Sequence, residues 1–427
     1  MITELQQAKT SQIHSETGPT LAEIQALDAE FVMGTYARNN VLFVRGEGAK
    51  LWDSEGREYL DFLAGIAVVG VGHCHPRLAH AIAEQARTLM HVSNLFHNPL
   101  QAKLAERLCH LADMEKAFFC NSGAEANEGA LKLARKWGKQ KRGDDCYEII
   151  TFEGSFHGRT MGAVSATAQP KYQAPFLPLV PGFRYAPRND FEAVENLVSE
   201  KTCAIMIEPI QGESGVHVAK PGFLAALREL CDRREVLLIF DEVQCGMGRT
   251  GHFLGSQALG VRGDVVTLAK GIADGFPMGA ILARGDAART LVPGDHGSTF
   301  AGQPLACAAA LSTLDIIVDE SLFENAKNVG AYFFSQLETL KNKYFQVFFE
   351  NRGVGLLVGT ELAIGIARPI FQRMLAAGII VNPIGDRILR FAPPLIVTRA
   401  DCDRVVSELG RSIAAELNFE ECKSSSG

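Results

Sequence analysis

The sequence lacks the long apolar run that a membrane-spanning helix requires, because no hydrophobic stretch approaches about 20 residues. It also lacks an excess of positive charge, since 42 Lys and Arg stand against 49 Asp and Glu and leave a net charge of -7. We therefore expect no binding to nucleic acid or to an anionic membrane surface. The opening residues show no basic region followed by an apolar core, so we expect no secretory signal and a cytoplasmic location.

The cysteines show no pattern that would define a site. The ten cysteines form no C-x-x-C pair, which argues against a zinc site and against a disulfide framework. The segment His73-Cys74-His75 resembles a ligand cluster. Side chains that alternate along so short a segment cannot all face one metal ion, and no matching ligands follow downstream. We therefore predict no metal site.

The composition is that of a globular enzyme, with 427 residues, 47% of them hydrophobic and 21% charged. This length allows a large core and favours two or more packed units. Between about residues 77 and 300, near-continuous apolar segments of strand length alternate with helical segments, which indicates an α/β fold with a mainly parallel central sheet. The predicted strands are residues 117–120, 147–152, 203–208, 236–241, 265–268 and 280–283, and the predicted helices are residues 76–90, 124–139 and 221–234.

The two ends of the chain differ from this central part. We predict that residues 1–75 contribute to a small domain, that residues 76–310 form the large domain, and that residues 311–427 form a smaller α+β domain. Within these ends we expect a peripheral helix in residues 1–30, short strands in 41–61, strands at 354–362, 379–384 and 387–393, helices at 369–377 and 400–417, and a disordered tail at 423–427.

Two charged residues stand where buried strands of the large domain stop. Asp241 ends the run of residues 236–241, and Lys270 follows the run of residues 265–268. Charges in such places are costly unless they meet a partner or a ligand. Pyridoxal phosphate (PLP) needs both groups, a lysine for its Schiff base and a carboxylate for its pyridine nitrogen. The alternative is a surface lysine and a helix cap.

Another strand end offers a candidate phosphate site. Ser122, Gly123 and Ala124 follow a strand and open a helix, where free N–H groups and the helix dipole hold anions. The alternative is an ordinary Ser N-cap with Glu125 three residues on.

A third strand end carries an aromatic and a basic residue. Phe156 has the flat face that stacks on a pyridine ring, and Arg159 can clamp a substrate carboxylate with two hydrogen bonds. The alternative is a core Phe and a solvated Arg. Residues 208–213 follow a further strand with Glu208 and Glu213. Because several polar strand ends converge on one edge of one sheet, we predict a ligand site at that edge.

At this point the chain resembles the class-III PLP-dependent aminotransferases over nearly its whole length. Residues 62–67 and 93–96 look most like the acetylornithine aminotransferase branch of that family. The resemblance implies PLP fold type I, a homodimer with active sites at the subunit interface, and transfer of an amino group to 2-oxoglutarate. The motifs that carry it are residues 122–126, 156–159, 208–213, 241–244, 270–271 and 298–300.

The resemblance also implies a role for each site residue. Lys270 would be the Schiff-base lysine and proton shuttle, and Asp241 would pair with the pyridinium nitrogen. Thr299 would reach the phosphate of the other subunit's cofactor. The implied cofactor-binding residues are Ser122, Gly123, Ala124, Phe156, Asp241, Gln244, Lys270 and Thr299, and the implied substrate-binding residues are Arg159, Glu213, Ser298 and Arg390.

Three positions bear on the substrate pocket. Val69 stands where a polar residue, often Asn, is expected, and Gln303 stands where Asn is usual. At the position of Ile66, the ornithine δ-aminotransferase relatives carry a tyrosine that binds the free α-amine. An apolar Ile66 cannot form that hydrogen bond, which fits a donor whose α-nitrogen is acylated.

These observations predict a PLP-dependent ω-aminotransferase whose amino donor is N2-acetyl-L-ornithine and whose acceptor is 2-oxoglutarate. The products would be N-acetylglutamate 5-semialdehyde and glutamate, a step of arginine biosynthesis. Succinylornithine, ornithine and 4-aminobutyrate remain alternative donors. A PLP aminomutase would not need a second carboxylate-binding arginine, so Arg390 speaks against it. A protein that kept only the fold would have little reason to retain Lys270, Asp241 and Gln244 together.

Overall fold

The computed structural model describes the backbone of residues 18–424 and the side chains up to Leu417. The predicted disordered tail, residues 423–427, lies wholly outside the described side chains, and residues 425–427 lie outside the description altogether. The predicted N-terminal helix is confirmed in its described part as α2 (Leu21–Phe31), while residues 1–17 lie outside the described range. Within residues 18–424, no helix is long and apolar enough to cross a membrane.

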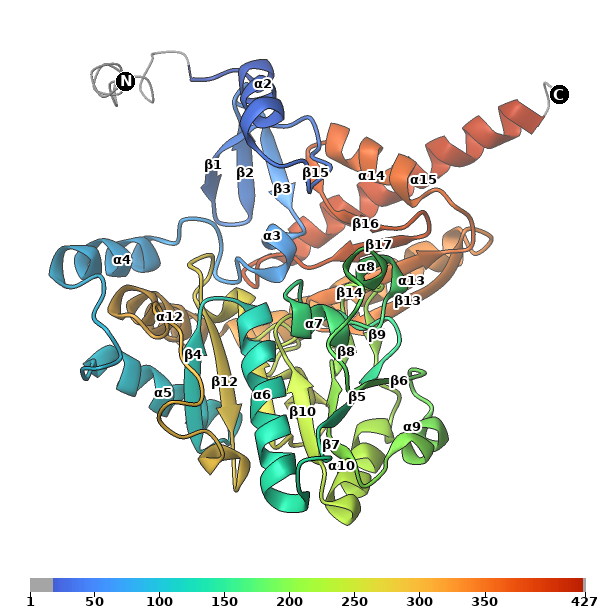
Figure 1. The fold of residues 1–427 in the computed structure, drawn as a ribbon. Coiled ribbons are helices and arrows are strands. Elements are labelled where there is room, and N and C mark those ends of the chain that lie inside the picture. The colour runs from blue at the N-terminus through green and yellow to red at the C-terminus, as the bar shows by residue number, and fades with distance from the viewer. Residues whose placement is uncertain (1–17, 425–427) are drawn as a thin grey trace.

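A seven-stranded sheet forms the centre of the molecule, in the order β4-β12-β11-β10-β7-β5-β6 (Figure 1). Four of its six neighbouring pairs are parallel, and the other two involve the single reversed strand β12, which runs antiparallel to both β11 and β4. The prediction of an α/β fold with a mainly parallel sheet is confirmed. The strands are β4 (Lys116–Cys120), β5 (Glu148–Phe152), β6 (Phe183–Ala186), β7 (Thr202–Ile207), β10 (Leu237–Asp241), β11 (Val265–Leu268) and β12 (Gly279–Ala283).

The sheet is apolar on both faces because successive strand residues point to opposite sides. In β10, Leu237 and Ile239 join the cluster under helix α6 (Gly123–Arg142), while Leu238 and Phe240 join the cluster on the other face. That second face is covered by α5 (Pro99–Ala112), α10 (Phe223–Arg234) and α12 (Pro304–Asp319), and α4 (Pro76–Thr88) packs against α12. Continuous burial of β7, β10, β11 and β12 explains why these strands appear as unbroken apolar runs in the sequence.

Two smaller sheets lie beside the ends of the parallel strands (Figure 1). In the first sheet, β15 of the C-terminal part pairs in parallel with β3 of the N-terminal part, so the two ends of the chain share one sheet. The division of the chain near residues 75 and 310 stays a prediction; helix α12 runs across residue 310. The first sheet contains β1 (Phe43–Glu47), β2 (Lys50–Asp53), β3 (Glu58–Asp61) and β15 (Ile379–Ile380); the second contains β13 (Phe348–Val354), β14 (Leu357–Leu362), β17 (Ile388–Phe391) and β16 (Asn382–Ile384).

Two predicted strands of the C-terminal part were wrong in their extent. The predicted strand at residues 354–362 contains the whole of β14, but its first residue is the last residue of β13, and the turn between the two strands contains Gly355 at φ +59°. The predicted strand at 379–384 is divided between β15 and β16, which belong to different sheets. In both cases apolar residues stand on both sides of the break, so the sequence pattern concealed the change of direction.

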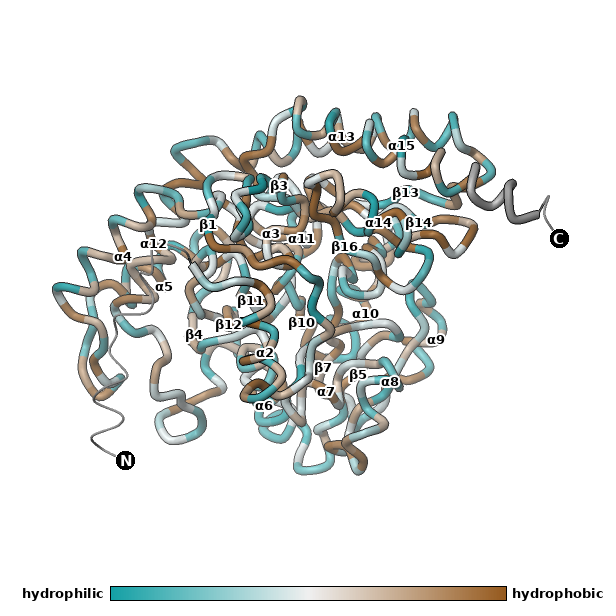
Figure 2. The backbone as a smooth tube through the Cα atoms, turned by 90° about the horizontal axis from the view of Figure 1, so that it is seen from above, coloured by the Kyte–Doolittle hydropathy of each residue, from teal (hydrophilic) through white to brown (hydrophobic). Residues whose placement is uncertain are grey.

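Long amphipathic helices cover the small sheets. Helix α13 (Leu322–Lys343) buries Leu322, Ala326, Val329, Phe333 and Leu337, a spacing of three and four residues that places them on one stripe. Figure 2 shows hydrophobic and hydrophilic stretches alternating along α13 and α15 (Arg399–Ser424). Together with α14 (Ala367–Ala376), these helices pack against the small sheets in one large hydrophobic core.

Candidate active site

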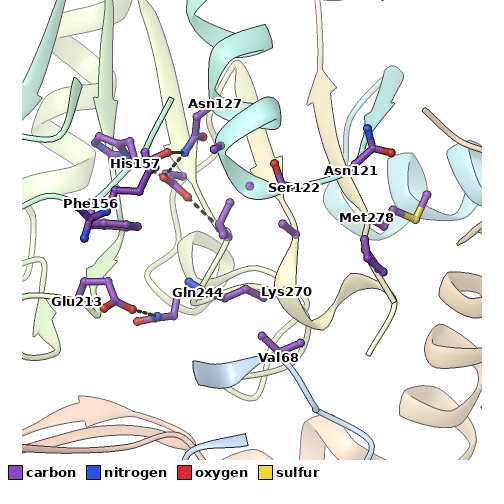
Figure 3. Close-up of a pocket in the computed structure, with 18 of the residues that line it drawn as sticks. Val68, Asn121, Ser122, Asn127, Phe156, His157, Glu213, Gln244, Lys270 and Met278 are labelled. Atoms are coloured by element: carbon purple, nitrogen blue, oxygen red, sulfur yellow. Dashed lines mark hydrogen bonds and ion pairs between the residues drawn. The ribbon is translucent and has the colours of Figure 1, made fainter. Parts of the chain in front are cut away.

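A cavity of about 400 Å³ lies where the parallel strands end. Its walls come from the segments that follow β4, β5, β7, β10 and β11, and from Val68 of the N-terminal part. In the view of Figure 3, Asn127, His157 and Phe156 lie on one side, Asn121 and Met278 lie on the other, and Lys270 lies between them. The predicted convergence of polar strand ends on one sheet edge is therefore present.

Lys270 stands immediately beyond β11, at the start of a short 3-10 turn (Lys270–Ile272). Its backbone has φ +46°, a conformation that non-glycine residues rarely adopt and that often marks a functional site. Burial lowers the pKa of the Lys270 amine, and the charge of Arg390 lowers it further; the carboxylates of Glu213 and Asp241 oppose both effects. A lysine with a lowered pKa holds a larger neutral fraction, which is the form that attacks a carbonyl.

Asp241 is the last residue of β10, and its side chain is 3% exposed. Its Oδ2 lies 2.8 Å from Asn127 Nδ2 and 2.7 Å from His157 Nδ1, and its Oδ1 accepts from the backbone N–H of Val243 at 3.0 Å. These donors compensate the buried charge. They also fix the direction in which the carboxylate can meet a further positive group.

Asn127 and His157 were missed as functional residues by the sequence reasoning. Asn127 is buried within α6; its amide nitrogen also donates to the carbonyl of His157, and its Oδ1 accepts from Thr267 Oγ1 at 2.8 Å. The Nε2 atom of His157 is buried without a hydrogen-bond partner among the described residues. A polar Asn on the otherwise apolar buried face of a predicted helix was the available signal.

The start of α6 has both features that its motif predicted as alternatives, a Ser N-cap and a possible anion site. Ser122 caps the helix, with its Oγ accepting from the backbone N–H of Glu125 at 3.2 Å. At the same time Ser122, Gly123 and Ala124 line the cavity, where the first N–H groups of a 20-residue helix favour an anion. A Cβ added at Gly123 would lie 2.7 Å from Val243 Cγ1, so the close contact between this turn and the segment after Asp241 requires glycine.

Phe156 and Arg159 follow β5, and Arg159 stacks on Tyr172, an aromatic residue outside the predicted motif. Phe156 lines the cavity, and its backbone N–H donates to Glu208 Oε1 at 2.8 Å. The Arg159 guanidinium lies 3.9 Å from the ring centre of Tyr172 and 5.5 Å from that of Phe156. This stacking leaves the N–H edges of Arg159 available for a carboxylate. Burial and the charge of Asp241 raise the pKa of Glu208 well above its usual range.

Glu213, Gln244 and Arg390 form a second buried network. Arg390, which is 1% exposed, donates to Glu213 Oε1 at 2.7 Å, to Gln244 Oε1 at 3.3 Å and to Asn382 Oδ1 at 2.7 Å. Gln244 Nε2 donates to the same Glu213 oxygen at 2.7 Å. Burial raises the pKa of Glu213, but the charges of Arg390 and Lys270 and the two hydrogen bonds outweigh it, so the net pKa is lowered. Gln244 therefore lies in the Glu–Arg network in this structure.

The remaining predicted residues lie outside the cavity of their own chain. Ser298 Oγ accepts from Asn121 Nδ2 at 3.0 Å and is thus one residue removed from the wall. Thr299 is exposed and does not line the cavity. Of the two unusual positions, Gln303 precedes Pro304 at the start of α12, and Val69 lies beside Val68, which does line the cavity. Among the described residues, no group of three or more His, Cys, Asp or Glu is arranged to hold a metal ion.

The donor set of the cavity fits PLP. An anion site at a helix start, an aromatic ring, a fixed carboxylate and a lysine with a lowered pKa match the phosphate, ring face, ring nitrogen and aldehyde of that cofactor. Ser122, Gly123 and Ala124 would hold its phosphate, and Asp241 its ring nitrogen. When bound, PLP supplies an electron sink for the carbon from which a proton is removed. Positioned acid–base help from a lysine adds roughly 10²–10⁴ in rate.

Sequence and structure comparisons agree with this class of site. The model of the "Aminotransferase class-III" family matches residues 33–413, and the chain belongs to this family of PLP-dependent enzymes. The acetylornithine aminotransferase of Caldanaerobacter subterraneus is 48% identical over 92% of this chain and 99% of its own length. That of Methanocaldococcus jannaschii is 48% identical over 90% of this chain and 96% of its own. The structure of ornithine aminotransferase from Toxoplasma gondii superposes with a TM-score of 0.91 at 34% identity, covering 96% of this chain and all of that one.

We expect Lys270 to be the residue that carries the cofactor. Reduction with borohydride should link PLP to the peptide that contains Lys270, as read by peptide mapping. Lys270→Ala should lose the absorbance of lysine-bound cofactor and roughly 10²-fold or more of the turnover, yet still bind PLP through the start of α6. Lys171→Ala, which removes an exposed lysine that stacks on Tyr172 near the cavity, is the matched control and should label normally. Labelling of another lysine would refute the assignment.

Proposed function

We propose that this aminotransferase moves the terminal amino group of N2-acetyl-L-ornithine to 2-oxoglutarate, giving N-acetylglutamate 5-semialdehyde and glutamate. The observation that carries the proposal is the ion pair between the buried Arg390 and the partly exposed Glu213, 2.7 Å apart, beside a cavity that Lys270 lines. The curated relatives named above are acetylornithine aminotransferases and match nearly the whole chain, which supports this donor.

The ion pair addresses the need to accept two unlike substrates in one cavity. Glutamate and 2-oxoglutarate carry two carboxylates, whereas the ornithine derivative presents an amine at its reacting end. A free guanidinium would favour the carboxylate and disfavour the amine donor. When Glu213 covers Arg390, as it does in this structure, the charges neutralise each other and the amine donor can enter; when Glu213 turns away, Arg390 can bind a carboxylate.

The segment near Ile66 supports an acylated donor. Ile66 is 40% exposed, and it is two residues from Val68 in the cavity wall. Its apolar side chain offers no partner for a free α-amine, while an acylated nitrogen carries no charge that needs one. Free ornithine, succinylornithine and 4-aminobutyrate are the competing donors.

A donor panel tests this choice of substrate. With 2-oxoglutarate as the acceptor, kcat/KM for N2-acetylornithine should exceed that for free ornithine and for 4-aminobutyrate by about tenfold or more, because a buried site leaves a free α-amine without a partner. Succinylornithine should lie between them or equal the acetyl donor. Equal efficiency with free ornithine would contradict the acetylornithine assignment and leave the aminotransferase assignment intact.

We also propose a homodimer with shared active sites. Large apolar side chains are exposed at Phe31, Met33, Leu95, Phe96 and Phe300. The last three belong to loops that touch each other, since Asn94 Nδ2 donates to the carbonyl of Ala301 at 2.9 Å. Exposed apolar surface of this kind is typical of an interface, and Thr299 lies within it. A cytosolic location is proposed as well, because the nine described cysteines are free thiols, which suits a reducing compartment.

The Glu213–Arg390 exchange predicts opposite effects of two substitutions. Glu213→Ala leaves Arg390 uncovered and should slow the acetylornithine half-reaction most, whereas Arg390→Ala should slow the glutamate and 2-oxoglutarate half-reaction most. Because a charged partner is lost in each case, the ratio of the two half-reaction rates should differ by about tenfold between the two variants. Single-turnover rates of each half-reaction measure this. Glu361→Ala, which breaks an ion pair of 2.6 Å with Arg352 in β13, is the control and should alter both halves equally. Equal slowing of both halves by the two test variants would refute the exchange.

Subunit mixing tests the contribution of Thr299 across the interface. Lys270→Ala and Thr299→Ala chains should each be nearly inactive, and a mixture should regain activity because one of the two sites in each hybrid is intact. With random exchange, about half of the dimers are hybrids, so activity should approach about one quarter of that of the wild type. Mixing Lys270→Ala with the double variant builds no intact site and serves as the control. No recovery, with exchange verified by mass spectrometry, would argue against a shared site.

A further inference from the structure

The segment of residues 64–72, which contains Val68 of the cavity wall, begins with a strained turn. Ala64, Gly65, Ile66 and Ala67 all have positive φ, at +52°, +62°, +76° and +60°. Consecutive left-handed residues are unfavourable for L-amino acids, and a β-branched residue such as Ile66 is a marked exception there. Such a turn persists only where its surroundings hold it. It therefore needs anchors at both of its ends.

The anchor at the start of the turn is Asp61, which ends β3 and is 2% exposed. Its Oδ1 accepts from the backbone N–H groups of Leu63 and Ala64, both at 2.8 Å. Its Oδ2 lies 2.8 Å from His73 Nε2, which ties the beginning of the segment to its end. These contacts lie within the N-terminal part of the chain and do not involve the turn of Lys270.

The anchor at the far end comes from the large domain. Asp274, four residues beyond Lys270, is 8% exposed, and its Oδ1 accepts from the backbone N–H of Val71 at 2.8 Å. A Cβ added at the neighbouring Gly70 would lie 3.5 Å from that oxygen, so the backbone passes close to the carboxyl group. Asp274 itself has φ +48°, which suits Asp, Asn or Gly better than other residues.

Between these anchors the segment lies against the turn that carries Lys270. A Cβ added at Gly271 would lie 3.8 Å from the carbonyl oxygen of Val68, so the two backbones are neighbours. Val68 lines the same cavity as Lys270. On the other side, the carbonyl of Gly70 accepts from the backbone N–H of Leu395, which connects the segment to the C-terminal domain. A shift of this segment would therefore move one wall of the cavity relative to the lysine.

We propose that Asp274 is a positioning residue, which fastens the strained segment of residues 64–72 to the Lys270 turn and so sets the distance between the Val68 wall and the lysine. Its importance for the reaction rests on the role of Lys270 proposed above, while the fastening itself does not. Without Asp274, the left-handed turn would keep Asp61 as its carboxylate anchor. The Val68 wall would then be free to move away from Lys270.

The charges around Asp274 give the fastening a dependence on pH. Burial raises the pKa of Asp274 to about 7, while the N–H groups of Val71 and Gly70 and the charges of His73 and Arg249 oppose that rise. Asp61, paired with His73, is the other carboxylate at this junction. If the segment opens and water reaches Asp274, its pKa returns to about 3.9. The closed form thus holds a proton that the open form releases, so opening becomes more favourable as pH rises from about 4 to 7 and changes no further above about 7.

Two substitutions at Asp274 distinguish the effect of losing the hydrogen bond to Val71 from the effect of disturbing the positive φ at residue 274. Asp274→Gly removes the acceptor and still permits φ +48°, whereas Asp274→Asn keeps an acceptor oxygen of the same shape and cannot ionise. Asp53→Asn is the control, because Asp53 is another buried carboxylate that accepts backbone N–H groups, those of Glu55 and Arg57, away from the Lys270 turn. All variants are made in the full-length protein loaded with PLP.

The first measurement is hydrogen exchange at the Val71 amide. Exchange should be about tenfold or more faster in Asp274→Gly, because the free energy lost with a buried hydrogen bond corresponds to about that factor in the opening equilibrium. It should stay near the wild-type rate in Asp274→Asn and Asp53→Asn. Unchanged exchange in Asp274→Gly would overturn the fastening, whatever the role of Lys270. The second measurement is the rate of PLP loss on dilution and the KM for both substrates. The rate of PLP loss and the KM values should rise in Asp274→Gly and return to near the wild-type values in Asp274→Asn. Faster exchange at Val71 with no change in PLP loss or KM would overturn the positioning role.

The pH dependence gives a third measurement. In the wild type, protection of the Val71 amide, corrected for the intrinsic exchange rate, should fall by up to about tenfold per pH unit between about pH 5 and 7 and then level off. In Asp274→Asn this fall should be absent. His73, Asp61 and Arg249 are unchanged in that variant, so the difference between the two proteins isolates Asp274. The same fall in both proteins would show that another group titrates and would overturn the pH dependence.

Discussion

The active site depends on the compensation of charges that a parallel sheet buries at one edge. Parallel strands end on the same side, so every polar residue that follows a strand is brought to one place where water is scarce. An isolated charge there would be expensive. The structure contains two networks, one around Asp241 and one around Arg390, in which each charge is held by groups from other helices and loops.

The two networks differ in how freely their side chains can move, and this difference suits the two roles proposed for them. Asp241 is held by Asn127 on a long helix and by His157 on a short loop, and both are packed in the core, so its direction is fixed. Glu213 is partly exposed, at 26%, and its hold on Arg390 uses a single flexible side chain. A rigid carboxylate suits a cofactor that stays in place, while a movable one suits two substrates that take turns.

Much of the fold was predictable because burial leaves a direct mark on sequence. The strands of the large sheet are covered on both faces, so they appear as apolar runs, and the predicted β11 agrees with the structure at both of its ends. The small sheets were harder, since apolar residues stand on both sides of the turn at Gly355 and of the division after Ile380. For the site, motif order predicted Lys270, Asp241 and Phe156, which all line the cavity, but gave no role to Asn127, Tyr172 or Asp274.

The sequence by itself determined most strands of the large sheet, the residue types at their ends and the family of the protein. These follow from local patterns, namely burial, turn residues and motif spacing. Only the tertiary structure decided which polar groups meet: Asn127 with Asp241 across 114 positions, Arg390 with Glu213 across 177, and Asp274 with Val71 across 203. The physical reason is that hydrogen bonds and ion pairs act over about 3 Å, and contacts at that range between distant residues exist only once the sheets have packed.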